Sequence, residues 1–172
     1  LSSNKLYGEI PNLSSLSNLT YLNLSNNDFT ADVWSSYSNL PNLEEIYVGH
    51  NNCNISNTDF SGFSGLKSLD ISKLNLTEIP ASLGSLQKLS SLNVSNNAIV
   101  SFSNLSSLNQ LQELNLANNN LNKVPSEIIN FISLKSLDLS NNIITDFSSL
   151  SNLINLEWLS LENNSLQNIP NQ

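Results

Sequence analysis

The sequence lacks several residue types on which particular functions depend. It has no arginine, and its six basic residues are outnumbered by fourteen acidic ones, for a net charge of −8. Arginine is the residue best shaped to contact phosphates and bases, and an acidic surface repels the phosphate backbone. We therefore expect no nucleic-acid partner. The single cysteine, Cys53, excludes an internal disulfide, and we expect it to be a small buried apolar residue.

Long apolar runs and targeting signals are also missing. No stretch of about 18 apolar residues occurs, so we expect no direct membrane insertion of this segment. The chain contains no methionine and no signal-peptide pattern, and it opens inside a repeat. We therefore expect residues 1–172 to be one domain that belongs to a longer chain.

What the sequence does contain is one pattern, L-x-x-L-x-L-x-x-N-x-L, repeated almost without interruption. Leucine, asparagine and serine occur 32 times each. A partial copy begins near residue 1, and the full copies open at Leu19, Leu43, Leu66, Leu89, Leu111, Leu134 and Leu156. A period of 20 to 29 residues is typical of a solenoid. The pattern therefore predicts one α/β solenoid.

This pattern resembles the leucine-rich repeat family over essentially the whole chain. The copies mix the typical 23-residue repeat with a 22-residue type, and residues 6–11 resemble the plant-type L-x-G-x-I-P motif. The resemblance implies a horseshoe with a parallel, concave β-sheet and short helical, 3-10 or extended convex segments. It also implies a binding surface rather than an enzyme.

The convex segments fall into two classes. Aliphatic-proline pairs open some of them, whereas residues 102–108 and 147–153 have apolar residues three apart, a spacing that suits a tight helical turn. The long segments 30–42 and 54–65 carry aromatic rings that we expect to plug the core: Trp34, Tyr37, Phe60 and Phe63.

An asparagine recurs where each predicted strand ends. In the family these side chains turn inward and bond the backbone of the neighbouring loop, which satisfies buried polar groups. The predicted ladder consists of Asn4, Asn27, Asn51, Asn97, Asn119, Asn142 and Asn164. Leu74 takes the asparagine position in one repeat, so we expect a tolerated lapse there, a local kink or a substitute donor.

Alternation within L-x-x-L-x-L places leucines inward and variable residues outward, where a ligand would meet them. Most outward positions are small and polar. Those that differ are the candidate binding residues on the concave face: Tyr21, Glu45, Tyr47, His50, Asp70 and Lys73 in one cluster, and Glu113, Asp138 and Trp158 farther along. Exposed aromatic residues often anchor interfaces, although scattered surface variation would also produce such a set.

The sequence offers no constellation for catalysis or cofactor binding. His50 is the only histidine, and it has no second histidine or usable cysteine to complete a metal site. No glycine-rich phosphate loop occurs among the five glycines. We therefore expect a protein that is not an enzyme and holds no metal or cofactor.

Eight N-x-S/T triplets are candidate glycosylation sites: Asn12, Asn18, Asn23, Asn54, Asn75, Asn93, Asn104 and Asn163. The composition alone predicts about seven such triplets, so their number is no enrichment. The absence of arginine, the few lysines and the abundant serine and asparagine favour an extracellular or cell-surface location, with the cytoplasm as the alternative.

These observations predict a protein- or peptide-binding segment of an extracellular or cell-surface protein, of the receptor or adhesion type, with its ligand on the concave face. One alternative is a structural segment of a longer array or filament, which would associate end to end. A second alternative is an intracellular signalling adaptor.

Overall fold

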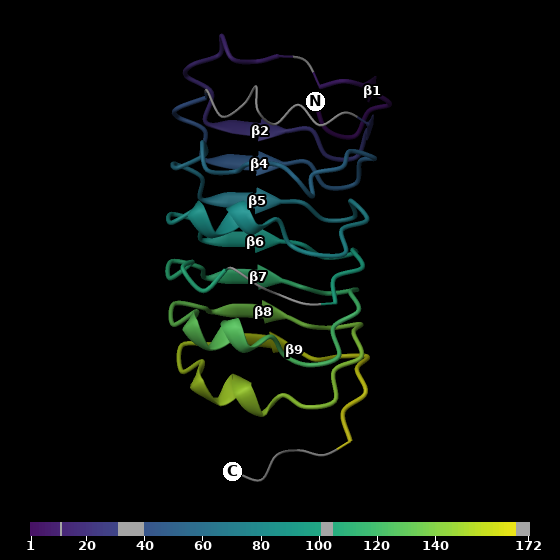
Figure 1. The fold of residues 1–172 in the computed structure, drawn as a ribbon, viewed down its shortest axis with the longest axis vertical. Helices are drawn as coiled ribbons and strands as arrows, with labels where there is room; N and C mark the ends of the chain where they lie inside the picture. Colours follow the sequence, from purple (N-terminus) through teal and green to yellow (C-terminus); the bar gives the residue numbers. More distant parts are fainter. Residues whose placement is uncertain (11, 31–39, 101–104, 168–172) are drawn as a thin grey trace.

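The computed structural model describes residues 1–10, 12–30, 40–100 and 105–167, and it confirms the predicted solenoid. A seven-stranded parallel sheet runs along one side of the stack, with the strands in sequence order (Figure 1). Its strands are β2 (Tyr21–Asn23), β4 (Glu45–Tyr47), β5 (Ser68–Asp70), β6 (Ser91–Asn93), β7 (Glu113–Asn115), β8 (Ser136–Asp138) and β9 (Trp158–Ser160). Each full repeat supplies one strand.

The strands pair in the register that the repeat predicts. Tyr21 lies opposite Glu45 and Asn23 opposite Tyr47, and the same steps continue to β9. The central residue of each strand points into the core: Leu22 and Leu137 are buried. The flanking residues therefore all face the concave side, in two parallel rows.

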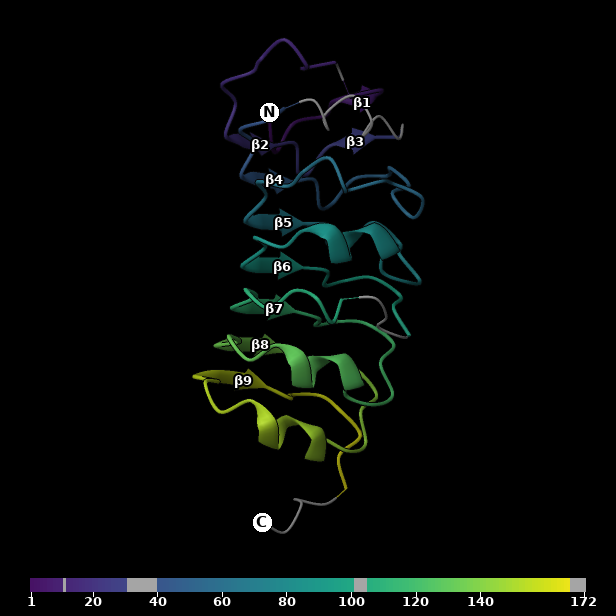
Figure 2. The same ribbon diagram turned by 60° about the vertical axis from the view of Figure 1, so that its left-hand side comes forward.

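A second, smaller parallel sheet lies on the side of the stack opposite the seven-stranded sheet (Figure 2). It consists of β1 (Tyr7–Gly8) and β3 (Asp28–Phe29). Phe29 is buried, whereas Tyr7 is 83% exposed. Tyr7 is thus a tyrosine on the surface that does not belong to the concave face.

In the described part of the chain, three 3-10 helices form convex segments: η2 (Ala81–Ser85), η3 (Ser126–Asn130) and η4 (Ser148–Asn152). The three-residue spacing of 147–153 forms η4 as predicted. The helices are not confined to that class, because η2 and η3 follow Pro80 and Pro125. Proline fixes φ near the helical value and has no N–H to lose, so it suits the start of such a turn. Residues 101–104 lie outside the described residues.

The interior is filled by aliphatic residues and by rings from the long convex segments. Phe60 and Phe63 are buried, with their ring centroids 6.0 Å apart. Cys53 is 1% exposed, in agreement with its predicted place in the core. Trp34 and Tyr37, for which the same role is predicted, lie outside the described residues.

The predicted ladder asparagines join successive turns by hydrogen bonds. Asn119 is representative: its Oδ1 accepts the Ile99 N–H at 3.0 Å, and its Nδ2 donates to the carbonyls of Val94 in the preceding repeat and Leu116 in its own. Asn27, Asn51, Asn97, Asn142 and Asn164 repeat the arrangement. Among the described residues, the Asn4 side chain bonds the carbonyls of Leu1 and Ser2 alone.

The ladder is interrupted at Leu74, which is 5% exposed. Asn97 of the next repeat covers part of the gap, because its Oδ1 accepts the N–H groups of both Leu74 and Leu76 at 3.0 Å. The turn is also irregular, with positive φ at Lys73 and again at Asn75. The structure therefore shows an irregular turn at Leu74, where the asparagine of the next repeat supplies an acceptor for two N–H groups, and the substitute donor stays a prediction.

Candidate functional site

The concave face carries an aromatic and acidic cluster on β2, β4 and β5. The rings of Tyr21 and Tyr47 lie 5.4 Å apart between centroids, with their planes tilted by 40°. The Tyr47 hydroxyl donates to Glu45 at 2.9 Å and shares a hydrogen bond with Ser68 at 3.2 Å. Tyr21 is 50% exposed. These contacts hold both rings in place, so they form a pre-organised aromatic surface.

The Tyr47 hydroxyl remains protonated in this cluster. The hydrogen bond with Ser68 lowers the pKa of Tyr47, but partial burial and the Glu45 carboxylate outweigh it and raise the pKa above its ordinary value of 10.0. The phenol therefore stays a hydrogen-bond donor and holds the carboxylate beside the two rings.

The second outward row has a structural role that sequence reasoning missed. Asp70 Oδ1 accepts the Ser72 N–H at 2.8 Å, and Asp138 Oδ1 accepts the Ser140 N–H at 2.9 Å. Asn23, Asn93 and Asn115 make the same bond to the residue two places on. This Asx turn ends five of the seven strands of the concave sheet. The recurrence of Asn or Asp in five of the seven copies was the available signal.

His50 and Lys73 do not lie on the strands. Both have positive φ, at 59° and 51°, in the turn that follows each strand. The equivalent residues in the other five full copies are asparagines with φ between 53° and 56°. Asparagine tolerates this left-handed conformation, so its recurrence was a turn signal. His50 and Lys73 instead line a hollow of about 360 Å³ together with Asp28, at the edge of the sheet.

The structure thus divides the first predicted cluster into two places. Tyr21, Glu45 and Tyr47 contact one another on the concave face, and Asp70 lies opposite Tyr47 on β5. His50 and Lys73, in the turns after the strands, line the separate hollow at the edge of the sheet.

The remaining three candidate residues gather in one hollow farther along the concave face. Glu113, Asp138 and Trp158 come from β7, β8 and β9 and line a depression of about 280 Å³. Trp158 is 50% exposed. Ser91 on β6 closes the far side and donates to Glu113 Oε2 at 3.0 Å. An indole ring and two carboxylates therefore surround the same small volume.

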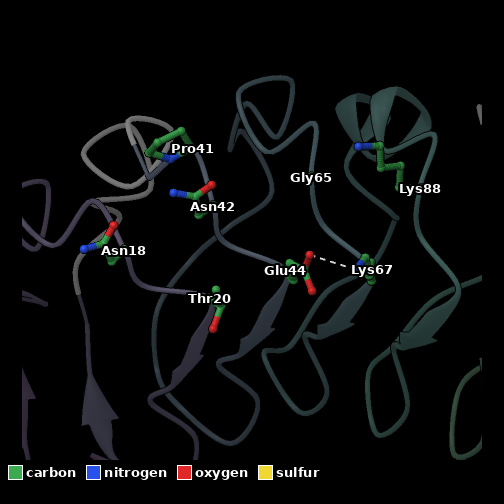
Figure 3. Close-up of a pocket in the computed structure, with 8 residues that line it drawn as sticks. All are labelled: Asn18, Thr20, Pro41, Asn42, Glu44, Gly65, Lys67 and Lys88. Carbon is green, nitrogen blue, oxygen red and sulfur yellow. Dashed lines mark ion pairs between the residues drawn. The ribbon is translucent and has the colours of Figure 1, made fainter.

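A further depression, which the sequence did not indicate, lies at the opposite edge of the sheet, where the chain enters the strands (Figure 3). Its volume is about 420 Å³, and Pro41 and Lys88 are among its lining residues. Lys67 and Glu44 form an ion pair of 2.7 Å across it. Because these two charges neutralise each other at an exposed site, this hollow is a weaker candidate than the concave face.

The candidate glycosylation sites differ in accessibility. Asn12, Asn18, Asn54, Asn75 and Asn163 are exposed. Asn23 and Asn93 are half-buried on the concave face and make the Asx-turn bonds, and Asn23 Nδ2 also donates to the Tyr21 hydroxyl. Asn104 lies outside the described residues.

Other classes of site find little support in the part of the chain that the structure describes. No group of three or more histidine, cysteine, aspartate or glutamate side chains there could hold a metal ion. Within the same residues, none of the helices has the length and apolar character needed to cross a bilayer. The concave face is the candidate site because its exposed rings and carboxylates contact one another and line a hollow.

Comparison with known families accounts for this architecture. The leucine rich repeat model matches residues 17–73, 64–121 and 109–166, so the chain belongs to the leucine-rich repeat family. Domains of this family are typically non-catalytic scaffolds that bind proteins or peptides.

Three relatives illustrate the range of similar proteins. A leucine-rich repeat protein of Leptospira interrogans is 29% identical, with a TM-score of 0.86 over 94% of this chain and 42% of its own. The Arabidopsis receptor kinase HAESA, solved with the peptide hormone IDA and the co-receptor SERK1, is 27% identical, with a TM-score of 0.74 over 94% of this chain and 29% of its own. The zebrafish (Danio rerio) transforming growth factor beta activator LRRC33 is 32% identical in an alignment of 92 positions that covers 48% of this chain and 13% of that protein.

The chain therefore spans less than half the length of each of these relatives.

Proposed function

We propose that this chain is the ligand-binding segment of an extracellular or cell-surface receptor or adhesion protein, and that it binds a protein or peptide on its concave face. The observation that carries the proposal is the Tyr21–Tyr47 pair, whose rings lie 5.4 Å apart on a hydrogen-bonded sheet. Aromatic residues held rigidly on a concave surface lose little conformational entropy on binding, and they are frequent hot spots of interfaces.

The similarity to HAESA, a receptor kinase solved with a peptide hormone, is consistent with this assignment. The placement of the acidic residues also supports it. Glu45 and Asp70 border the tyrosine pair, so the cluster offers apolar area and charged acceptors together. A partner could bury a side chain against the rings and hydrogen-bond the carboxylates at their rim.

The test is a peptide library displayed on phage and selected against the immobilised chain. Tyr21→Ala and Tyr47→Ala should each abolish binding of most selected clones, because they remove the aromatic surface. Tyr7→Ala is the matched control, since Tyr7 is 83% exposed and lies away from the concave face. Asp70→Asn should weaken binding of the same clones, and it should keep the Asx turn because asparagine makes the same bond in other repeats. Glu78→Gln, which removes a charge from the segment after the strand and its turn, should leave binding of these clones unchanged.

Clones that bind Tyr47→Ala and Tyr7→Ala equally well would place recognition elsewhere and overturn the proposal. The circular dichroism spectrum and melting temperature of each variant separate lost binding from lost folding.

Intact mass with peptide mapping tests the compartment, because glycans on exposed sites such as Asn12 and Asn54 would place the protein outside the cell. The two alternative functions stay predictions. The oligomeric state would test a structural segment of a longer array, and the cellular compartment would test an intracellular signalling adaptor.

A further inference from the structure

The outward positions of the concave sheet bear charges of one sign. Among the described residues of β2 and β4–β9, these positions carry four carboxylates and no lysine: Glu45, Asp70, Glu113 and Asp138. The two ion pairs of the described residues, Lys67–Glu44 and Lys135–Glu157, precede the strands and neutralise other groups. The face therefore has an uncompensated negative potential, which attracts positively charged partners.

The hollow between β7 and β9 concentrates this potential beside an aromatic ring. Glu113 and Trp158 lie in the same row on either side of Ser136, and Asp138 lies in the neighbouring row on the middle strand. Hydrogen bonds from Ser91 and Ser140 engage one oxygen of each carboxylate. The second oxygen of each accepts no hydrogen bond from the described residues, so both can accept a donor from a ligand.

We infer that this hollow binds a cationic side chain, arginine above all, from an extended basic segment of the partner. A guanidinium group can stack on the indole of Trp158 while its edge donates to Glu113 and Asp138. A neutral or acidic side chain would leave two carboxylates partly desolvated and unpaired. This inference rests on the proposed function, because it names the chemistry of a partner that binds the same concave face.

The same acidic arrangement occurs a second time, which adds a spacing to the inference. Asp70 lies one strand after Glu45 and in the neighbouring row, as Asp138 does relative to Glu113. The two pairs are three strands apart, or about 14 Å at the usual spacing of parallel strands. An extended chain covers that distance in about four residues, at roughly 3.4 Å each. The partner segment therefore presents two basic side chains four positions apart, one in each acidic pair.

The experiment measures the binding of defined peptides to the whole chain by calorimetry, and follows the indole N–H resonance of Trp158. The probe is an acetylated, amidated Gly/Ser peptide with two arginines at positions i and i+4. A second peptide replaces both arginines by citrulline, which keeps the shape and removes the charge. A third peptide places the arginines at i and i+2.

We expect the first peptide to shift the Trp158 resonance, and the citrulline peptide to bind at least about tenfold more weakly. Glu113→Gln and Asp138→Asn should each weaken the arginine peptide by roughly three- to tenfold. Both variants should fold, because the amide oxygen in Glu113→Gln can still accept the Ser91 hydroxyl, and asparagine already makes the same Asx turn at Asn93 and Asn115. Glu78→Gln removes the same charge outside the concave strands and should leave the affinity for the arginine peptide unchanged.

Several results would overturn the inference. Equal binding of the citrulline peptide would remove the need for a cation, and an equal loss in Glu78→Gln would indicate bulk charge rather than a site. Equal binding of the i, i+2 peptide would refute the two-point spacing. If phage-selected clones need Tyr47 and tolerate both Glu113→Gln and Asp138→Asn, the concave site stands and this inference fails. If those clones ignore the concave face altogether, the proposed function fails first.

Discussion

Replacing Asn97 with alanine should destabilise the solenoid more than the same replacement at Asn119. The reason is the leucine at position 74. Asn97 Oδ1 accepts two partly buried N–H groups, those of Leu74 and Leu76, and its Nδ2 donates to the Ile71 carbonyl at 3.1 Å. In other repeats that carbonyl would also accept a bond from the asparagine of its own repeat, but this position is Leu74. Alanine at 97 therefore leaves three backbone groups without the bond that satisfies them.

The Asn119 side chain makes four hydrogen bonds against five for Asn97, and its acceptors have second donors. The Val94 carbonyl also accepts from Asn97 Nδ2, and the Leu116 carbonyl also accepts from Asn142 Nδ2. The Ala117 carbonyl keeps its bond from a backbone N–H. Alanine at 119 therefore orphans one group only, the Ile99 N–H.

The difference in magnitude follows from this count. A buried polar group left without a partner costs about 1 to 3 kcal/mol. We apply the lower value, about 1 kcal/mol, to every orphaned group at both positions. Two additional orphaned groups at about 1 kcal/mol each make Asn97→Ala more destabilising by about 2 kcal/mol. For a chain of this size, that corresponds to a melting temperature lower by roughly 4 to 8 °C.

Urea unfolding followed by circular dichroism, together with thermal melting, measures both variants against the parent chain. Asn120→Ala is the control: Asn120 is exposed and makes its hydrogen bond through the backbone, so its stability should change by less than about 0.5 kcal/mol. Equal losses at positions 97 and 119, or a larger loss at 119, would refute the count of orphaned groups.

The other predictions concern the turns and one carboxylate. Lys73→Asn should raise the free energy of unfolding by about 1 kcal/mol, because asparagine tolerates φ of 51° better than lysine does; an unchanged urea midpoint would contradict this. Gly49→Ala should lower stability, because the added Cβ would press against the Ser72 hydroxyl, and Ser72→Ala should restore part of the loss in the double variant. The Ser148 N–H and hydroxyl both bond Asp146 at 2.9 Å and lower the pKa of its carboxyl below 3.8. The contribution of these two bonds to stability is therefore fully present above the pKa that Asp146 has in the unfolded chain. It is lost as pH falls through the pKa that Asp146 has in the folded protein. In an NMR titration of Ser148→Ala, the pKa of Asp146 should rise only part of the way to its ordinary value, because the Ser148 N–H still bonds the carboxylate. A full return of the pKa to its ordinary value would contradict the larger contribution of the backbone bond.

The repeat period predicted the fold and the positions of the ladder asparagines, because a solenoid imposes the same demands on every turn. The period could not assign the two remaining asparagine-rich columns. Asn96 and its equivalents look like outward strand positions until the left-handed φ is known, and for that reason the sequence grouped His50 and Lys73 with the strand residues. Asn93 looks like a ligand-facing amide, yet its side chain ends a strand.

The candidate site was predictable in composition and less so in grouping. Outward aromatic and acidic residues can be read from the alternation within each strand. Whether Trp158 faces Glu113 across one hollow depends on side-chain rotamers, and whether Tyr47 bonds Glu45 depends on how two long side chains fold across a strand. Neither follows from periodicity, because a period fixes the positions of Cβ atoms and leaves side-chain torsions open.

The interruption at Leu74 also bears on how the molecule comes apart. Elsewhere each ladder asparagine ties its own turn to the preceding one, so a local opening on either side meets resistance from its neighbour. Between the second and third full repeats this tie is missing, because Leu74 occupies the position of the asparagine that would make it, whereas Asn97 ties the third repeat to the fourth. Under a pulling force or a protease, the stack should therefore part first at this level, into two blocks that each retain several turns.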